Sequence, residues 1–519
     1  MPIVRSFLAD HAIALRDKPA VVDDRPGAPV TVWSFAELNR QANRLANLLL
    51  GLGVAPGEKV VWCGQNSLEA VRALHALPKI GAVAVPLNYR LTAEETAYVV
   101  DNSDAVAVYV DAEQAGLFAR IAHTIPRVRH VIVFGGRPGP GMLSAEGLLA
   151  RARDTEIEVD IPAGIPSTML YTSGTTGRPK GALRLPIDPA HTRPLLELVG
   201  HRPDDVYLTT GPLYHSGPLG YLGINHRIGA TAVLQRRFDP EDWLRLVAKY
   251  RVTTTFSAPA PIRLVCALPD EVKERYDVRS MRRMIANAAP WSMALKEAYM
   301  RDFGEDSLWE VYGSTELGVD TVLAPPDHRR KPGSCGRAVP GVEIRLYDEA
   351  GAEVTEPGVP GEVYVRGVSV FETYYKAEEK AAAARREGFA TVGDIAYRDA
   401  DGFYYICDRK SDMIISGGMN VYPAEIEAAL ERHPGVADVA VFGIPSEEWG
   451  ESVHAVVVPR PGRTLASEEV VAFARERLAG YKIPRSVAIV SEIPRNGSGK
   501  ILKRVLREPF WQGRRARVS

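Results

Sequence analysis

The sequence predicts an α/β protein with a large N-terminal domain of mostly parallel sheets, a β-rich subdomain, and a small α+β C-terminal domain. Three observations predict this. Helices and short apolar strands alternate over roughly the first 335 residues, short alternating strands follow over about 336–407, and a compact α+β segment fills 408–519. At 519 residues the chain exceeds the length at which a single core stops growing, so several structural units are expected.

The N-terminal alternation begins with an amphipathic helix at residues 35–53, where Leu38, Ala42 and Leu45 share one stripe and Gly53 ends the helix. A strand at 59–63, a helix at 67–80 and strands at 82–86 and 105–110 follow. The pattern returns in the strands at 230–234 and 253–257. Strands joined through helices favour a parallel sheet.

After about residue 336 the alternation of helices and strands ends, and short strands expected at 342–346, 361–365 and 403–406 are separated by turns. The last segment reads as a helix at 423–431, strands at 436–442 and 453–458, and a helix at 467–478. Its length of about 110 residues is typical of an independent domain.

Composition excludes several classes of function. Lys plus Arg total 63 and Asp plus Glu total 64, so no overall charge attracts nucleic acid, and an anionic ligand must be bound locally. The four cysteines lie far apart and form no Cys-x-x-Cys pair, which argues against zinc or a disulfide framework. We find no uncharged apolar run near the roughly 18 residues that span a bilayer. We therefore expect a cytoplasmic protein without a transmembrane segment; peripheral contact with a membrane stays open.

One loop concentrates groups that bind anions. Residues 171–181 read YTSGTTGRPKG and follow an apolar run, so they lie at the end of a strand, where α/β proteins place ligands. Glycines let backbone amides turn towards an anion, hydroxyls add donors, and Lys180 adds charge. The loop is not a P-loop, because Lys180 is followed by Gly181 instead of Ser or Thr.

The loop resembles the signature of the adenylate-forming superfamily, which comprises acyl- and aryl-CoA ligases, luciferases and the adenylation domains of peptide synthetases. The other motifs of that superfamily follow in its order: YHSG from Tyr214, NAAP from Asn287, VYGSTE at 311–316, VGD at 392–394, DRK at 408–410, SGGMNVYP at 416–423 and PRNGSGK at 494–500. The resemblance therefore covers nearly the whole chain.

The resemblance implies a binding site for ATP and Mg²⁺. Tyr312 is expected to pack on adenine, Thr315 to contact the α-phosphate, and Glu316 to ligate Mg²⁺ together with Thr176. Taken alone, Ser314 to Glu316 also fits a helix cap, and an aspartate after glycine such as Asp394 fits a turn. The full set implied for the nucleotide is Thr172, Ser173, Gly174, Thr175, Thr176, Gly177, Lys180, Ala288, Ala289, Pro290, Tyr312, Gly313, Ser314, Thr315, Asp394, Arg409 and Lys500, with Asp394 and Arg409 on the ribose.

The C-terminal part is expected to be mobile, with its hinge at Asp408. The resemblance makes Lys500 the catalytic lysine of adenylation, where a cation bridges the carboxylate and the α-phosphate as charge builds in the transition state. Ser416, Gly417 and Gly418 are expected to line the passage of the CoA pantetheine arm, since a backbone without side chains lets a thin chain pass.

The reaction implied is activation of a carboxylic acid as acyl-AMP, followed by transfer to CoA. The acyl pocket is expected to contain Tyr214, His215, Gly220, Asn287 and Trp291, with His215 as a catalytic gate near the acyl carboxylate. Amino-acid substrates are disfavoured, because His215 stands where the peptide synthetases carry an aspartate and a buried ammonium without a partner is costly.

The acid is expected to be a medium to long fatty acid, an aryl acid or a steroid or bile-type acid. A luciferase-like enzyme, or an adenylation domain that passes the acyl group to a carrier protein, stays open as an alternative. A catalytically inactive scaffold or acyl-AMP-binding protein is disfavoured, because Glu316, Asp394, Arg409 and Lys500 are all present. A homodimer is compatible with the sequence.

Overall fold

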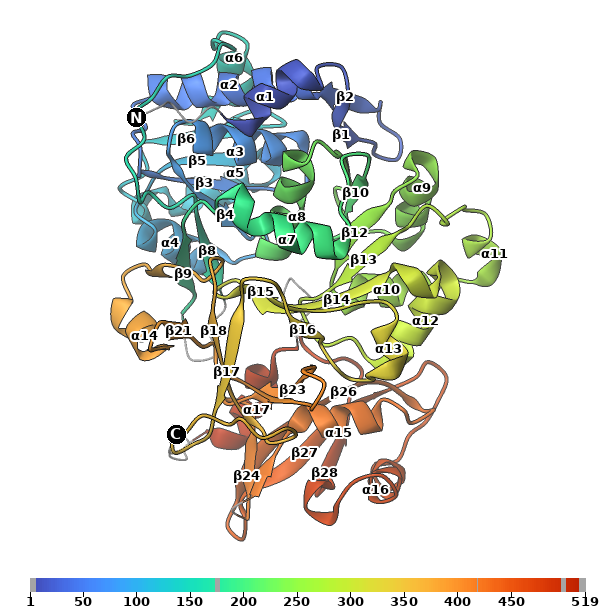
Figure 1. Cartoon of the computed structure of the whole chain (residues 1–519). Helices are drawn as coiled ribbons and strands as arrows, with labels where there is room; N and C mark the ends of the chain where they lie inside the picture. The colour runs from blue at the N-terminus through green and yellow to red at the C-terminus, as the bar shows by residue number, and fades with distance from the viewer. Residues whose placement is uncertain (1–5, 173–177, 418, 496–500, 513–519) are drawn as a thin grey trace.

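A computed structural model describes residues 6–172, 178–417, 419–495 and 501–512 of the chain. Within these residues the strands form four sheets (Figure 1). The two largest sheets occupy the blue to yellow-green part of the chain, the β-rich subdomain lies below them, and the orange to red C-terminal part forms the far end of the molecule.

The first sheet is eight-stranded and parallel across its centre, from β8 to β7. Antiparallel strands β9 and β19 extend its other edge. In spatial order the strands are β19 (Thr373–Tyr374), β9 (Lys180–Arg184), β8 (Thr168–Thr172), β4 (Val83–Leu87), β3 (Lys59–Cys63), β5 (Ala105–Asp111), β6 (His130–Phe134) and β7 (Leu143–Ser144).

The second sheet is nine-stranded, with parallel strands from β1 through β14 and antiparallel strands at both edges. In spatial order it contains β16 (Arg337–Ala338), β15 (Gly318–Leu323), β14 (Leu308–Ser314), β13 (Arg283–Ala286), β12 (Thr254–Ser257), β10 (Val206–Thr209), β11 (Thr231–Leu234), β1 (Pro19–Asp23) and β2 (Thr31–Ser34). The expected fold of mostly parallel sheets is confirmed.

Helices cover both sheets and begin where the sequence offers caps. Ser34 caps α2 by accepting a hydrogen bond from the Glu37 amide, and the stripe through Leu38, Leu45 and Leu49 is fully buried. The helices are α1 (Phe7–Ala14), α2 (Phe35–Gly51), α3 (Leu68–Lys79), α4 (Ala93–Asn102), α5 (Ala112–Ile121), α6 (Ala145–Leu149), α7 (Pro189–Val199), α8 (Ser216–Arg227), α9 (Pro240–Tyr250), α10 (Pro259–Cys266), α11 (Asp270–Lys273), α12 (Met293–Phe303), α13 (Asp327–Arg330) and α14 (Glu378–Ala383).

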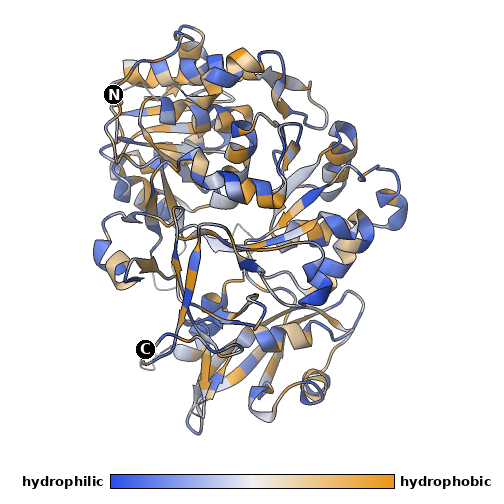
Figure 2. Ribbon diagram, in the orientation of Figure 1, coloured by the Kyte–Doolittle hydropathy of each residue, from blue (hydrophilic) through white to orange (hydrophobic). Residues whose placement is uncertain are grey.

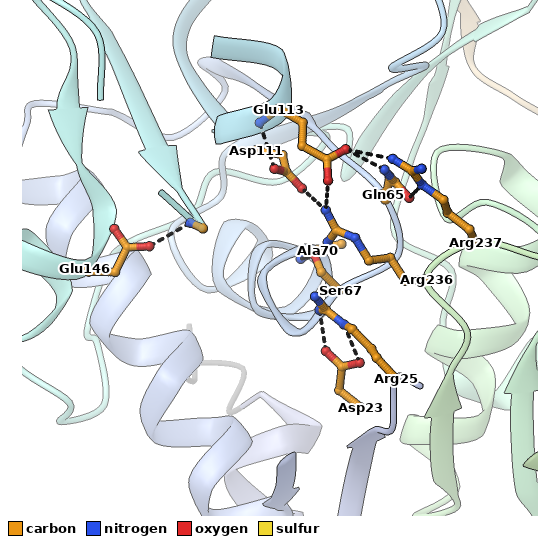
Figure 3. Close-up of polar contacts among 11 residues, drawn as sticks. Asp23, Arg25, Gln65, Ser67, Ala70, Asp111, Glu113, Glu146, Arg236 and Arg237 are labelled. Atoms are coloured by element: carbon orange, nitrogen blue, oxygen red, sulfur yellow. Dashed lines mark hydrogen bonds and ion pairs between the residues drawn. The ribbon is translucent and has the colours of Figure 1, made fainter. Parts of the chain in front are cut away.

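Polar contacts join the two large sheets. The Arg236 guanidinium, just beyond β11, donates to Asp111 Oδ2 at the end of β5 at 2.9 Å and to Glu113 Oε1 in the first turn of α5 at 2.8 Å (Figure 3). Arg237 donates to Gln65 Oε1 at 2.7 Å. Beside them, Asn66 donates to the carbonyl of Gly211. These contacts fix the loops after β10 and β11 against the first sheet.

The β-rich subdomain is a six-stranded antiparallel sheet in which β17 pairs with β18. Its strands are β20 (Arg385–Arg386), β21 (Phe389–Ala390), β18 (Gly361–Arg366), β22 (Asp394–Arg398), β23 (Tyr404–Arg409) and β17 (Glu343–Tyr347). The strands expected at 342–346, 361–365 and 403–406 correspond to β17, β18 and β23.

The C-terminal part contains a five-stranded sheet packed against helices, as expected for an α+β unit. Its elements are β24 (Ile414–Ser416), β25 (Met419–Val421), α15 (Pro423–Leu430), β26 (Val436–Ser446), β27 (Gly450–Pro459), α16 (Ser467–Arg475), β28 (Ser486–Ile489) and α17 (Lys503–Trp511). The division of domains at residue 408 stays a prediction.

Apolar residues concentrate on the sheet strands, whereas the helices carry apolar and polar residues on different faces (Figure 2). Among the described helices, each is too short or too polar to cross a membrane.

Candidate active site

One large cleft of about 2750 Å³ lies between the two large sheets and reaches the start of the C-terminal part. Its lining includes Thr172 at the end of β8, Thr315 just after β14 and Arg409 at the end of β23. The cleft thus meets the carboxyl ends of parallel strands, the usual position of ligands in such sheets.

Glu316 is a carboxylate in the lining of the cleft. Thr172 Oγ1 and the Tyr374 hydroxyl each donate to Glu316 Oε1 at 3.0 Å. Lys180 Nζ lies 5.0 Å from the centroid of the Tyr374 ring. Burial lowers the pKa of Lys180, with Lys380 adding to this effect and Glu316 opposing it. Lys180 can therefore bind an anion close to the position where the Glu316 carboxylate can bind a hard cation.

The described residues contain no cluster of three or more His, Cys, Asp or Glu side chains that could hold a metal ion alone. A single carboxylate suits Mg²⁺, which is usually bound through one or two carboxylates together with substrate phosphates. Glu316 fits this pattern, because Thr172 and Tyr374 engage only its Oε1 atom.

The turn that carries Thr315 is held by close backbone packing. A Cβ atom at Gly313 would lie 1.9 Å from the Gly318 carbonyl oxygen, and Gly318 has a φ of +95°, so both positions require glycine. Ser314 Oγ accepts a 3.0 Å hydrogen bond from the Leu317 amide. The Arg184 guanidinium donates to the Thr315 carbonyl oxygen.

Tyr312, Asp394 and Arg409 contact one another beside the cleft, and of the three only Arg409 lines it. The Tyr312 hydroxyl donates to Asp394 Oδ2 at 2.7 Å, and Arg409 Nε pairs with Asp394 Oδ1 at 3.1 Å. Burial, reinforced by Asp394, raises the pKa of Tyr312 well above its usual value, so the phenol stays protonated and donates. The carboxylate keeps further lone pairs with which it can accept hydroxyl donors.

Asn287 and Ala288 form a strained corner after β13. Asn287 Nδ2 donates to the Val311 carbonyl at 2.6 Å, and its Oδ1 accepts from the Ala288 amide. Ala288 has a φ of +69°, which is costly for a residue with a Cβ and often marks functional sites. Both residues line the cleft, whereas Ala289 and Pro290 do not.

His215 reaches the cleft from the N-cap position of α8. Burial, with Arg90 acting in the same direction, lowers its pKa to about 4, so the imidazole is neutral near pH 7. Its buried Nε2 has no hydrogen-bond partner among the described residues. The next residue, Ser216, bonds through its Oγ to Thr315 Oγ1 at 2.9 Å.

Two residues expected in the acyl pocket lie elsewhere. Trp291 is 4% exposed and packs in a core cluster, with its ring edge-on to Tyr299. Tyr214 is also buried, with its ring 4.4 Å from that of His215. Neither lines the cleft, whereas His215, Gly220 and Asn287 do.

The chain matches the AMP-binding enzyme family over residues 8–375 and the AMP-binding enzyme C-terminal domain over residues 425–500. It belongs to the AMP-binding enzymes.

Relatives and solved structures agree with this membership. The chain is 35% identical to a feruloyl-CoA synthase of Amycolatopsis sp. over 98% of both chains, and 35% identical to the indoleacetate–CoA ligase of Aromatoleum aromaticum over 92% of both. Among solved structures, the anthranilate CoA ligase AuaEII in complex with anthranoyl-AMP superposes with a TM-score of 0.88, at 26% identity and over 98% of each chain.

In this AMP-binding enzyme Asp408 links two parts of the chain. Its Oδ1 accepts from the Arg409 amide at 2.7 Å and its Oδ2 from the Ala424 amide at 2.9 Å, in the first turn of α15. Burial raises the pKa of Asp408 to about 6, although Lys503 opposes the shift. The expected pivot therefore caps the first helix of the C-terminal part.

The expected CoA-passage residues Ser416 and Gly417 lie in the β24–β25 hairpin, at the end of the C-terminal part remote from the large sheets (Figure 1). They do not line the cleft. Gly417 has a φ of +59°, and a Cβ there would lie 2.8 Å from Trp449 Cε3. Ser173, Gly174, Thr175, Thr176, Gly177, Gly418 and Lys500 lie outside the residues that the structure describes.

Sequence reasoning missed Arg184, Ser216 and Tyr374. Arg184 supports the Thr315 turn and also donates to the Ser369 carbonyl at 2.8 Å. Its only signal was a basic residue in the apolar stretch after Gly181. Tyr374 carried no signal, because its contact with Glu316 joins residues far apart in the chain.

Proposed function

We propose that this AMP-binding enzyme is an ATP- and Mg²⁺-dependent carboxylic acid–CoA ligase that works through an acyl adenylate. The observation that carries the proposal is the convergence on one cleft of Thr315, Glu316 and Arg409, whose guanidinium pairs with Asp394 behind it. The two relatives and the structure named above are CoA synthases or ligases, and the structure contains an acyl-AMP. The substrates are ATP, CoA and a small carboxylic acid.

The first half-reaction joins two anions. A carboxylate oxygen of the acid forms a bond to the α-phosphorus of ATP, the bond to the β-phosphate oxygen breaks, and pyrophosphate leaves. The Thr315 hydroxyl donates a hydrogen bond to the α-phosphate. Asp394 and Arg409 bind the ribose, and Tyr312 packs on adenine. Glu316 and Thr176 hold Mg²⁺, which offsets negative charge on the phosphates when it is bound.

His215 suits the acyl carboxylate because its imidazole is buried and neutral. A neutral donor can orient the carboxylate without pairing so strongly that it lowers the nucleophilicity of the oxygen. Trp291 is given no role in this step, because its side chain is buried and does not line the cleft.

The second half-reaction is the transfer to CoA. The CoA sulfur forms a bond to the acyl carbon, the bond from that carbon to the phosphate oxygen breaks, AMP leaves, and the thiol proton passes to solvent. Rotation at Asp408 brings Ser416, Gly417 and Gly418 to the cleft for this step. The β24–β25 hairpin does not line the cleft and lies at the end of the C-terminal part remote from the large sheets (Figure 1), which supports a rotation.

We place the enzyme in the cytoplasm, where ATP and CoA are available. The acid is a fatty, aryl or steroid-type acid, and the aromatic acids named for the relatives support a substrate larger than a short chain. A homodimer is compatible with this function, and light scattering would measure its presence.

The two half-reactions provide the test, through Lys500→Ala. We expect this variant to form acyl-AMP at least about a hundredfold more slowly than wild type, because the cation that bridges the two anions is lost. It should convert chemically prepared acyl-AMP and CoA to the thioester at nearly the wild-type rate. Normal adenylate formation in Lys500→Ala, or no CoA-dependent AMP release by wild type with any acid of a broad panel, would contradict the proposal.

A further inference from the structure

The cleft continues beyond the reacting groups along one face of α8. Ser216, Gly220, Gly223 and Arg227 recur at helical spacing, so they form a single stripe, and all four line the cleft. Ser216 lies at the chemical end, where its Oγ bonds to Thr315. Arg227 lies at the far end, about 16 Å away along the helix axis.

The middle of the stripe is open. A Cβ atom added at Gly220 or at Gly223 would meet no other atom within 4 Å. By contrast, a Cβ at Gly217, on another face of the same helix, would lie 2.3 Å from Phe256 Cζ. The absent side chains therefore leave space in the cleft and are not needed for packing. Ile224, Leu195 and Ile187 supply apolar walls.

The far end of the stripe holds an unmatched cation. The Arg227 guanidinium carbon lies 5.1 Å from the centroid of the Phe7 ring, and burial lowers the pKa of Arg227, with Asp188 acting in the opposite direction. Asp188 itself accepts from the Ala190 amide at 2.8 Å. In the part of the chain that the structure describes, the Arg227 guanidinium has no hydrogen bond or ion pair.

The Arg227 guanidinium has five N–H donors, and none of its nitrogens is among the buried polar atoms without a partner, so the donors are open to water or to a ligand oxygen that enters the cleft. At the near end of the channel, the buried His215 Nε2 has no partner among the described residues. The channel therefore offers donors at both ends and an apolar surface between them. A ligand with an oxygen acceptor at each end can bind both, with His215 as the tautomer that carries its proton on Nε2.

We propose that the acid activated by this enzyme is an elongated apolar molecule with a second oxygen acceptor at the end remote from the reacting carboxylate, and that Arg227 binds that oxygen. The acceptor is a carbonyl or a carboxylate oxygen. This inference rests on the proposed ligase function and narrows its substrate class. It makes Arg227 a specificity-determining residue that takes no part in the chemistry.

The test compares three acids of equal chain length: dodecanoate, 11-oxododecanoate and dodecanedioate. The readout is kcat/KM for CoA-dependent AMP release by wild type, Arg227→Gln, Arg227→Lys and the control Arg193→Gln, whose residue is exposed on α7. We expect wild type and Arg193→Gln to prefer at least one oxygenated acid over dodecanoate by about tenfold, through KM.

In Arg227→Gln the ratio of kcat/KM for an oxygenated acid to kcat/KM for dodecanoate should fall to about one. Arg227→Lys should restore part of this ratio for dodecanedioate. Preference for both oxygenated acids identifies a general oxygen acceptor, and preference for dodecanedioate alone identifies an anion; both support the proposal. Equal kcat/KM for the three acids in wild type, or an unchanged preference in Arg227→Gln, overturns this inference and leaves the ligase function standing. Absence of AMP release with all three acids and with a broader panel overturns both.

Discussion

The Tyr312 hydroxyl donates a 2.7 Å hydrogen bond to Asp394 Oδ2, and this bond connects β14 of the nine-stranded sheet with β22 of the β-rich subdomain. The same carboxylate pairs with Arg409 at the end of β23. A strand of the nine-stranded sheet and a hairpin of the β-rich subdomain thus meet at one carboxylate, and the proposed ribose position depends on both.

Tyr312→Phe should raise the KM for ATP by about three- to tenfold. The ring remains to pack on adenine, but Asp394 loses one neutral hydrogen bond, whose net contribution is typically about 0.5–1.5 kcal/mol. Initial rates at varied ATP concentration measure the effect. Tyr364→Phe, on β18 and outside the cleft lining, serves as the control. An unchanged KM in Tyr312→Phe would mean that this bond does not position the nucleotide.

Glu316→Gln should lower kcat by about a hundredfold and raise the Mg²⁺ concentration needed for half-maximal rate. The amide oxygen can still accept from Thr172 and Tyr374, so the local geometry is kept while the negative charge is lost. Pyrophosphate release at varied Mg²⁺ is the measurement. The matched control is Glu305→Gln, an exposed glutamate that pairs with Arg329. Wild-type Mg²⁺ dependence in Glu316→Gln would remove this residue from the metal site.

Gly217→Ala and Gly220→Ala should change stability in opposite directions. A Cβ at Gly217 would overlap Phe256, and overpacking typically costs about 1–3 kcal/mol. At Gly220 it meets no atom within 4 Å, so the gain in helix propensity should raise the free energy of unfolding by about 0.5–1 kcal/mol. Urea denaturation of both variants measures the difference. Equal destabilisation would show that Gly220 does not face open space.

Acid should destabilise the fold through buried histidines such as His328. Burial, with Lys296 adding to it, lowers the pKa of His328 to about 4, whereas a histidine in the unfolded chain has its ordinary pKa of about 6.5. The unfolded state therefore binds more protons between these values. The stability associated with neutral His328 is present above pH 6.5 and is lost as pH falls towards 4, by about 2–3 kcal/mol.

The measurement is the free energy of unfolding of wild type and His328→Gln across pH 4 to 7.5. Glutamine can still donate to the Leu308 carbonyl, which His328 Nε2 contacts at 3.1 Å. We expect a shallower loss in acid for His328→Gln than for wild type or for a control at the exposed His191. Parallel curves for all three proteins would exclude His328 as a source of the pH dependence.

Much of the architecture could be predicted because its signals are local. The helix at 35–53 and the strand at 59–63 were expected from apolar periodicity and correspond to α2 and β3. The motif order likewise identified Tyr312, Asp394 and Arg409, which the structure brings together. Whether Trp291 faced the cleft or the core could not be predicted, because Asn287 and Trp291 share one short loop and leave it in different directions.

The sequence by itself determined the order of the elements, the superfamily resemblance and the chemical types in the site, since each depends on neighbouring residues. Only the tertiary structure decided which side chains meet. Arg184 supports Thr315 from across 131 residues, and the stripe that ends at Arg227 faces a cleft whose other walls come from distant segments. The physical reason is that burial and hydrogen bonding are set by contacts between segments, and these contacts exist only after the sheets have packed together.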